Sequence, residues 1–180
     1  MKDHHPGLPE SAPPAEEMYL RILPDLKRIA SRLLAAESGR KSLSSGDIVG
    51  QVYVKVRETT RIQWQSDEHL KSFCVTCARR YLVDRARKDP PHERVSVSWA
   101  LNEPAPEEID TLDLNEAMTK LQVRSERAFY AVEMWSGGMT QKEIAGVLEL
   151  SIDTVKDDLE LGRMFLRREL QKGLHGDASA

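Results

Sequence analysis

Two cysteines and a histidine are the residues of this 180-residue chain whose spacing resembles that of metal or redox sites. Cys74 and Cys77 form a C-x-x-C pair, and His69 precedes Cys74 by five positions. A structural zinc ion normally takes four ligands, and the sequence supplies no persuasive fourth one. The pair lies inside an apolar helical run, and only Arg79 is placed to lower a thiol pKa. We therefore interpret both cysteines as small buried hydrophobic residues and predict no metal site.

Catalytic signatures are also missing from the sequence. It has no glycine-rich phosphate loop, no nucleophile motif and no carboxylate pair in a defined setting. We expect a protein that is not an enzyme and needs no cofactor. No uncharged apolar run approaches the roughly 18 residues that cross a bilayer, and the first 17 residues lack the pattern of a secretory signal. With only two cysteines, the expected location is the cytoplasm.

The most specific motif of the chain lies in residues 137–165. Two glycines break a preceding helix, and Thr140 with Glu143 has the spacing of a capping box. Ser151 is placed to cap the next helix, and Ala145 is small where two helices must cross. The inward positions of that next helix are Val155, Leu159, Gly162 and Leu166. The pattern predicts a helix-turn-helix whose second helix lies in the DNA major groove; a plain helical hairpin in a core is the alternative.

The rest of the chain predicts an all-α protein, because apolar residues recur at helical spacing in most segments. A first helix is expected from about Pro24. Residues 47–58 are ambiguous, since alternating valines indicate a strand while Ile48, Val49, Val52 and Val56 also share a helical face. Ser44, Ser45 or Asp47 offers an N-cap for that segment. Residues 69–88 predict a helix with a strongly basic end.

The charge distribution divides the chain into modules. Residues 16–90 carry 15 basic and 10 acidic side chains, residues 91–115 carry 1 and 6, and residues 116–172 carry 9 and 10. The acidic stretch contains four prolines in or beside it, which is typical of a linker. We predict two small helical domains, at 17–89 and 111–172, joined by a flexible acidic linker at 90–110. Residues 1–16 and 173–180 are predicted to be disordered tails.

Three segments, taken in order, resemble the extracytoplasmic-function (ECF) sigma factors of bacterial RNA polymerase. Residues 47–56 (DIVGQVYVKV) are similar to the polymerase-binding helix of that family. Residues 77–88 (CARRYLVDRARK) are similar to the helix that faces the promoter −10 element, and residues 140–163 to the −35 module. The resemblance covers residues 17–171 and implies that residues 47–58 form a helix. It also implies core RNA polymerase and promoter DNA as partners, with an anti-sigma protein as a further one.

The resemblance assigns a role to three groups of residues. The polymerase-binding group is Asp47, Gln51, Val52, Tyr53 and Lys55. The −10 group is Trp64, Arg79, Arg80, Arg85, Arg87 and Lys88, whose cations would neutralise phosphates. Trp64 is either the lining of a pocket for an unstacked base or a core residue of its domain. The −35 group is Thr140, Ser151, Asp153, Thr154, Lys156, Asp157 and Arg163.

The outward face of the predicted recognition helix is acidic and apolar rather than basic. It presents Asp153, Asp157, Leu161 and Met164, with Glu160 beside them. Carboxylates repel phosphates, although one can accept a hydrogen bond from a cytosine amino group. Our hypothesis is that tethering to the polymerase compensates through effective concentration. Two other functions remain open: a helix-turn-helix regulator that needs no polymerase, and a sigma-like protein-interaction module with weak DNA binding.

Overall fold

The computed structural model describes residues 15–35, 37–38, 43–59, 62–88, 94–96 and 108–176. The predicted tails, for residues 1–14 and 177–180, and the middle of the predicted linker, residues 97–107, lie outside these ranges. The helices are α1 (Ala15–Ala35), α2 (Ser45–Glu58), α3 (Asp67–Lys88), α5 (Thr111–Arg124), α6 (Glu126–Ser136), α7 (Gln141–Leu148) and α8 (Ile152–Gly176). The strands are β1 (Glu37–Ser38), β2 (Arg94–Ser96) and β3 (Glu108–Asp110). The all-α prediction is confirmed, and no helix of these ranges is long and apolar enough to cross a bilayer.

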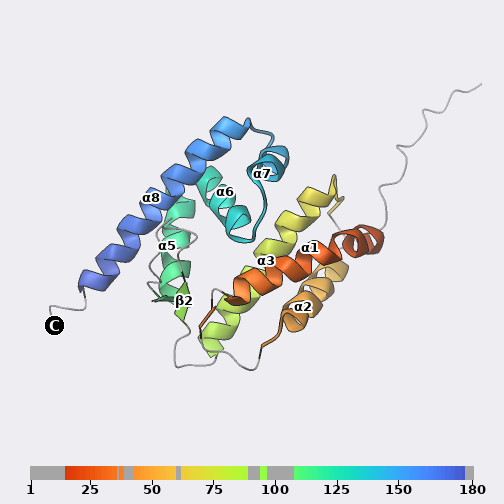
Figure 1. The fold of residues 1–180 in the computed structure, drawn as a ribbon, viewed down its shortest axis with the longest axis horizontal. Helices are drawn as coiled ribbons and strands as arrows, with labels where there is room; N and C mark the ends of the chain where they lie inside the picture. The colour runs from red at the N-terminus through yellow and green to blue at the C-terminus, as the bar shows by residue number, and fades with distance from the viewer. Residues whose placement is uncertain are drawn as a thin grey trace, which may run out of the picture.

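Helices α1, α2 and α3 form an N-terminal unit (Figure 1). Its interior holds Ile22 and Leu26 of α1, Val52 of α2, and Leu70 and Cys74 of α3, all of them buried. The hydroxyl of Tyr19 donates to the backbone carbonyl of Val49 at 2.9 Å, so α1 and α2 are joined by a polar contact as well. Burial raises the pKa of Tyr19 to about 12, which keeps this donor protonated.

Residues 45–58 form helix α2, which settles the ambiguity of the valine-rich segment. Ile48, Val52 and Val56 are buried at a spacing of four, whereas Val54 is 45% exposed. A strand would have buried Val54 together with Val52 and Val56, because alternate side chains share a face. Ser44 is the N-cap: its Oγ accepts from the amide of Asp47, and the Asp47 carboxylate accepts from the Ser44 amide at 2.8 Å. The predicted capping chemistry is thus confirmed at Ser44.

The prediction that the first helix begins near Pro24 is wrong. Helix α1 begins at Ala15 and contains Pro24, so it also extends into the segment that the sequence predicts to be a tail. A proline inside a helix removes one backbone hydrogen bond. The burial of Met18, Tyr19 and Ile22 before the proline offsets that loss, and Glu16 and Glu17 favour a helix start.

The described ends of the predicted linker form two short strands. Strand β2 pairs antiparallel with β1, Glu37 lying opposite Val95, and with β3, Val95 lying opposite Ile109. The Ile109 side chain is buried, and Asp110 caps α5 by accepting from the amide of Leu112 at 2.7 Å. The described parts of this segment therefore form a small sheet with β1, and β3 is joined to α5 by the Asp110 cap.

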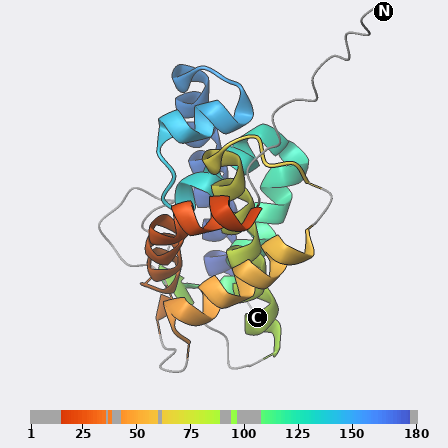
Figure 2. The same cartoon turned by 90° about the vertical axis from the view of Figure 1, so that its right-hand side faces the viewer.

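Helices α5 to α8 form a C-terminal unit, and α3 is the helix of the N-terminal unit that lies against it (Figures 1 and 2). The C-terminal core includes Leu121 of α5, Val132 of α6, and Val155, Leu159 and Leu166 of α8. Helix α3 packs on α1 and α2 and also on α5, α6 and α7. The sequence predicts two bodies joined by a linker; in the structure those two bodies are packed against each other.

Candidate nucleic-acid interface

The helix-turn-helix is built from local capping contacts. Thr140 Oγ1 accepts from the amide of Glu143 at 3.2 Å, and the Thr140 amide donates to Glu143 Oε2 at 2.8 Å. Helix α7 ends where Glu149 adopts a left-handed conformation with φ 54°, and the Leu150 amide then donates to the Ala145 carbonyl. Ser151 Oγ accepts from the amide of Thr154 at 3.0 Å and begins α8. Both caps predicted from the sequence are confirmed.

Helix α8 turns its acidic face to solvent. Val155, Leu159, Gly162 and Leu166 are buried as predicted, and the predicted outward residues Asp153, Asp157, Leu161 and Met164 are exposed. Lys156 Nζ lies 2.9 Å from Asp153 Oδ1, so this lysine is paired on the surface of its own helix. The exposed face of the recognition helix consequently has an acidic excess, which disfavours phosphate contact.

Arg163 and the buried Asp158 hold α8 against α6. The guanidinium of Arg163 lies 4.2 Å from the centroid of the Trp135 ring, within the range of a cation–π contact. Asp158 is buried and accepts two hydrogen bonds from Arg127, at 2.7 and 3.0 Å. In this structure Arg163 therefore contacts the protein itself rather than projecting from the outer face of α8.

The basic end of α3 presents three of the five predicted cations to solvent. Arg80, Arg87 and Lys88 are exposed, Arg85 is half-buried, and Arg79 faces the C-terminal unit. Arg87 Nη1 lies 3.7 Å from Asp84 Oδ1, a loose pair on the helix surface. Because exposed guanidinium and ammonium groups neutralise phosphates without further rearrangement, this end of α3 suits the DNA backbone.

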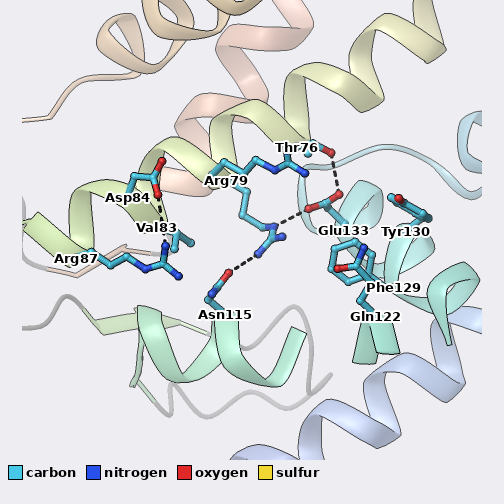
Figure 3. A pocket seen from close by; sticks show the side chains of 11 residues that line it. Thr76, Arg79, Val83, Asp84, Arg87, Asn115, Gln122, Phe129, Tyr130 and Glu133 are labelled. Carbon is cyan, nitrogen blue, oxygen red and sulfur yellow. Dashed lines mark hydrogen bonds and ion pairs between the residues drawn. The ribbon is translucent and has the colours of Figure 1, made fainter. Parts of the chain in front are cut away.

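Arg79 lies at the side of a cleft of about 330 Å³ between α3, α5 and α6 (Figure 3). Its Nε donates to Glu133 Oε1 at 2.6 Å, and its Nη1 donates to Asn115 Oδ1 at 3.1 Å. Thr76 Oγ1 donates to the other carboxylate oxygen of Glu133 at 2.8 Å. Glu133 is only 1% exposed, and a buried carboxylate needs hydrogen-bonding partners. Arg79 and Thr76 of α3 supply them.

Trp64 is a buried residue of the N-terminal unit. Its ring centroid lies 5.0 Å from that of Phe73 and 5.5 Å from that of His69, both on α3. The indole Nε1 is buried and has no hydrogen-bond partner among the described residues. Of the two interpretations of Trp64, the packed one matches this geometry.

Of the five residues predicted to bind polymerase, Asp47, Gln51 and Lys55 are exposed, and Val52 is buried in the core. Lys55 Nζ lies 2.8 Å from Glu58 Oε2, so this lysine is paired on its own helix. The Tyr53 hydroxyl donates to Glu16 Oε1 at 3.0 Å, and Asp47 is engaged in the cap of α2. Hydrogen bonds from the backbone and side chain of Ser44 lower the pKa of Asp47, and the charge of Arg85 lowers it further.

The cysteine pair is packed in α3. Cys74 is buried and Cys77 half-buried, and both are free thiols. Burial raises the pKa of each thiol, which disfavours the thiolate needed for metal binding or exchange. Within the described part of the chain, no three His, Cys, Asp or Glu side chains gather as metal ligands would.

Sequence reasoning missed the residues that join the two units. These are Lys71 and Thr76 of α3, Asn115 of α5 and Glu133 of α6. One signal was present for Glu133, which is the acid within the apolar stretch AFYAVEMW. The exposure of the apolar residue Val54 on α2 was also not predicted. A strand would place Val54 on the same face as Val52 and Val56, whereas a helix places it on the opposite side.

The fold is all-helical and carries a helix-turn-helix unit beside a second helical unit. The ECF sigma factor family matches residues 11–172, and the chain belongs to this family. None of the curated proteins compared with the chain matches it. The protein accordingly acts as a sigma factor in transcription initiation.

Proposed function

We propose that this chain binds core RNA polymerase through α2 and directs it to promoters, with α3 on the −10 element and α7–α8 on the −35 element. The observation that carries the proposal is a capped helix-turn-helix with the outer face of α8 free, in a chain whose other unit ends in an exposed basic helix. Together the two surfaces would provide one contact for each element of a bipartite promoter, which neither surface would provide alone.

Polymerase binding is assigned to the outer face of α2. Asp47, Gln51, Val54 and Lys55 are exposed at helical spacing and form one stripe, the α2 stripe. A stripe with one apolar residue among polar ones suits a helical partner surface. Val52 is buried on the opposite side of α2, and the Tyr53 hydroxyl joins α2 to α1 through its hydrogen bond to Glu16.

Promoter binding is assigned to two surfaces of different character. The basic end of α3 supplies positive charge for the phosphates of −10 DNA. Unstacked bases need an aromatic or apolar surface, and the ring pair of Trp64 and Phe73 would offer one if the loop at residues 62–66 moved. The −35 contact would use Thr154 and Asp157 for bases, and backbone amides near Ser151 for phosphate. Because α8 is acidic, this second contact depends on tethering by the polymerase.

The experiment combines the purified chain with core polymerase on a promoter library and maps transcript starts. A shared upstream motif at new starts supports the proposal. Replacing both Arg80 and Arg87 with Ala should reduce these starts at least tenfold. The matched control is Arg28→Ala, an exposed arginine of α1 that pairs with Asp25 on its own helix.

The same experiment separates the other functions. DNA binding at defined sites without polymerase indicates an independent regulator. Polymerase binding without new starts indicates a sigma-like interaction module, which the exposed carboxylates of Asp153, Asp157 and Glu160 favour. Either result would contradict the proposed function.

A further inference from the structure

The cleft between α3, α5 and α6 holds more positive charge than its own residues neutralise. Its α3 wall carries Arg79, Arg80 and Arg87. The acidic residues of its lining are Asp84 and Glu133, so three cations face two anions. Glu133 is buried and already pairs with Arg79, and the excess charge therefore lies with the more accessible arginines.

Arg80 and Arg87 are the two cations of the lining that are free to receive an anion. Arg80 is exposed, and among the described residues no ion pair or hydrogen bond engages its guanidinium. Arg87 has only the loose 3.7 Å pair with Asp84, and both of these side chains are more than half exposed. The two arginines share one face of α3 and are separated by about 10 Å along the helix axis. Because each guanidinium can hold a phosphate with two hydrogen bonds, this spacing suits a ligand with two linked phosphates.

The opposite end of the cleft is aromatic and uncharged. Figure 3 shows Arg87 at one end of the lining and Phe129, Tyr130 and Gln122 at the other. The ring centroids of Phe129 and Tyr130 lie 5.2 Å apart, and Tyr130 is 37% exposed, so part of its ring is open to a ligand. An aromatic ring binds a flat heterocycle by stacking, and the exposed amide of Gln122 can hydrogen-bond to the edge of such a ring.

A polar side chain lies between the charged end and the aromatic end. Asn115 of α5 accepts a hydrogen bond from Arg79 through Oδ1, so its side-chain NH₂ group remains available as a donor. Figure 3 shows this pair in the middle of the cleft, between Arg87 and Phe129. A ligand that reached from Arg87 to the aromatic rings would therefore pass a hydrogen-bond donor on its way.

The size of the cleft suits a small molecule rather than a macromolecule. Its volume of about 330 Å³ lies at the lower end of the range of about 300–1,000 Å³ that is typical of small-molecule sites. Duplex DNA is far too wide to enter a space of this volume. The ligand is therefore a compact one, with anionic groups at one end and a flat ring at the other.

We propose that this cleft binds a nucleoside diphosphate, with its phosphates on Arg80 and Arg87 and its base against Tyr130. A simple inorganic anion would leave the aromatic end unused, and an uncharged heterocycle would leave both arginines without an anion. Asp84 opposes binding, since its carboxylate competes with the phosphates for Arg87. The site goes beyond the proposed function and does not depend on it, because the free chain contains every residue of the site.

Titration calorimetry with the purified full chain tests the site. The probes are ADP, GDP, CDP and UDP, with the free nucleosides and pyrophosphate as their separate parts. We expect at least one of the nucleotides to bind with a Kd below about 1 mM and more tightly than its nucleoside or pyrophosphate alone. If none of the nucleotides binds at concentrations up to about 1 mM, the proposal is overturned.

Charge substitutions of opposite sign locate the binding in the cleft. Arg80→Ala and Arg87→Ala should each weaken the binding of nucleotide and of pyrophosphate about tenfold, because each removes a charge-assisted contact. Asp84→Asn should tighten binding about threefold, since it removes the competing carboxylate. The matched controls are Arg28→Ala and Glu160→Gln, which change exposed charges outside the lining. Equal effects in the cleft variants and the controls would mean that only the overall charge matters, and would overturn the proposal.

Tyr130→Ala distinguishes a nucleotide site from a plain anion site. We expect this variant to bind the nucleotide about tenfold more weakly because stacking is lost, and to bind pyrophosphate as the native chain does. If both ligands or neither of them lose affinity, the base does not contact Tyr130 and the proposal fails. A short thymidine oligonucleotide is the last comparison. If it binds more tightly than every nucleotide and depends on the same three side chains, the cleft holds a DNA strand instead of a free nucleotide, which also overturns the proposal.

Discussion

Gly162 of α8 lies so close to Val132 of α6 that a Cβ on the glycine would overlap Val132 Cγ2. The next nearest atoms are the Ala128 carbonyl oxygen and Leu121 Cδ2, both at 3.5 Å. Three helices of the C-terminal unit therefore converge on a residue without a side chain. This convergence fixes the angle at which α8 leaves the core and hence the direction of its outward face.

We expect Gly162→Ala to destabilise the protein by about 1–2 kcal/mol, since overpacking a filled core costs more than the helix gains from alanine. Gly146→Ala is the matched control, because Gly146 is also a helical glycine but has no atom within 4 Å of an added Cβ. That change should be neutral or stabilise by up to about 1 kcal/mol. Urea unfolding measures both; equal effects of the two substitutions would contradict the packing argument.

The parts of the fold that depend on neighbouring residues were predictable from the sequence. The caps at Ser44, Thr140 and Ser151 join residues three apart, so residue type and spacing are sufficient to identify them. The inward face of α8 followed from helical spacing in the same way. Local spacing alone could not predict the structure of segment 47–58, because its valines fit both the strand period and the helix period. Packing against α1 decides in favour of the helix.

The contacts between the units could not be predicted. Arg79 and Glu133 are 54 positions apart, and nothing local distinguishes Arg79 from the solvent-facing Arg80. The ion pair between Arg79 and Glu133 forms only when α3 packs against α6. The same holds for Trp64, whose burial depends on α3 rather than on the polar loop that contains it.

Glu143 links stability to pH. Burial alone would raise the pKa of this carboxyl, but hydrogen bonds from Thr140 and the contact with Lys71 lower it overall. A lowered folded-state pKa stabilises the protein above the unfolded value of 4.5, and this contribution is lost as pH falls through the folded pKa. We therefore expect Glu143→Gln to destabilise at pH 7 and to lose its effect in acid.

Thermal unfolding from pH 7 to pH 3 checks the prediction for Glu143. The free energy of unfolding of the variant should be about 1–2 kcal/mol lower than that of the native chain at neutral pH, because the variant loses a cap contact and one ion pair. Glu126→Gln serves as the control, because Glu126 is exposed and its substitution should give a small, nearly constant difference. A difference at Glu143 that persists unchanged to pH 3 would exclude this assignment.

The α2 stripe predicts a substitution that separates polymerase binding from folding. Val54→Glu places a charge at the centre of the stripe, and we expect at least tenfold weaker assembly with core polymerase because an apolar contact is replaced by an unpaired carboxylate. Val54 is exposed, so the melting temperature should change little. Val123→Glu is the matched control, an exposed valine on α5 outside the stripe. Equal loss of assembly in both variants would remove polymerase binding from the α2 stripe.

The acidic face of α8 predicts a gain rather than a loss. Replacing Asp153 and Asp157 with Asn removes two negative charges from the exposed face of α8, and we expect the free chain to bind duplex DNA about 3–10-fold more tightly at low salt. Polymerase-dependent starts should change less, since tethering supplies an effective concentration in the millimolar range. Lys156→Gln changes charge in the opposite direction on the same helix and should weaken binding. The opposite result would be weaker DNA binding by the Asn variant together with a loss of base preference at one position of the site. In that case Asp157 accepts a hydrogen bond from the base at that position, and the acidic face contributes to sequence recognition rather than repelling the DNA phosphates.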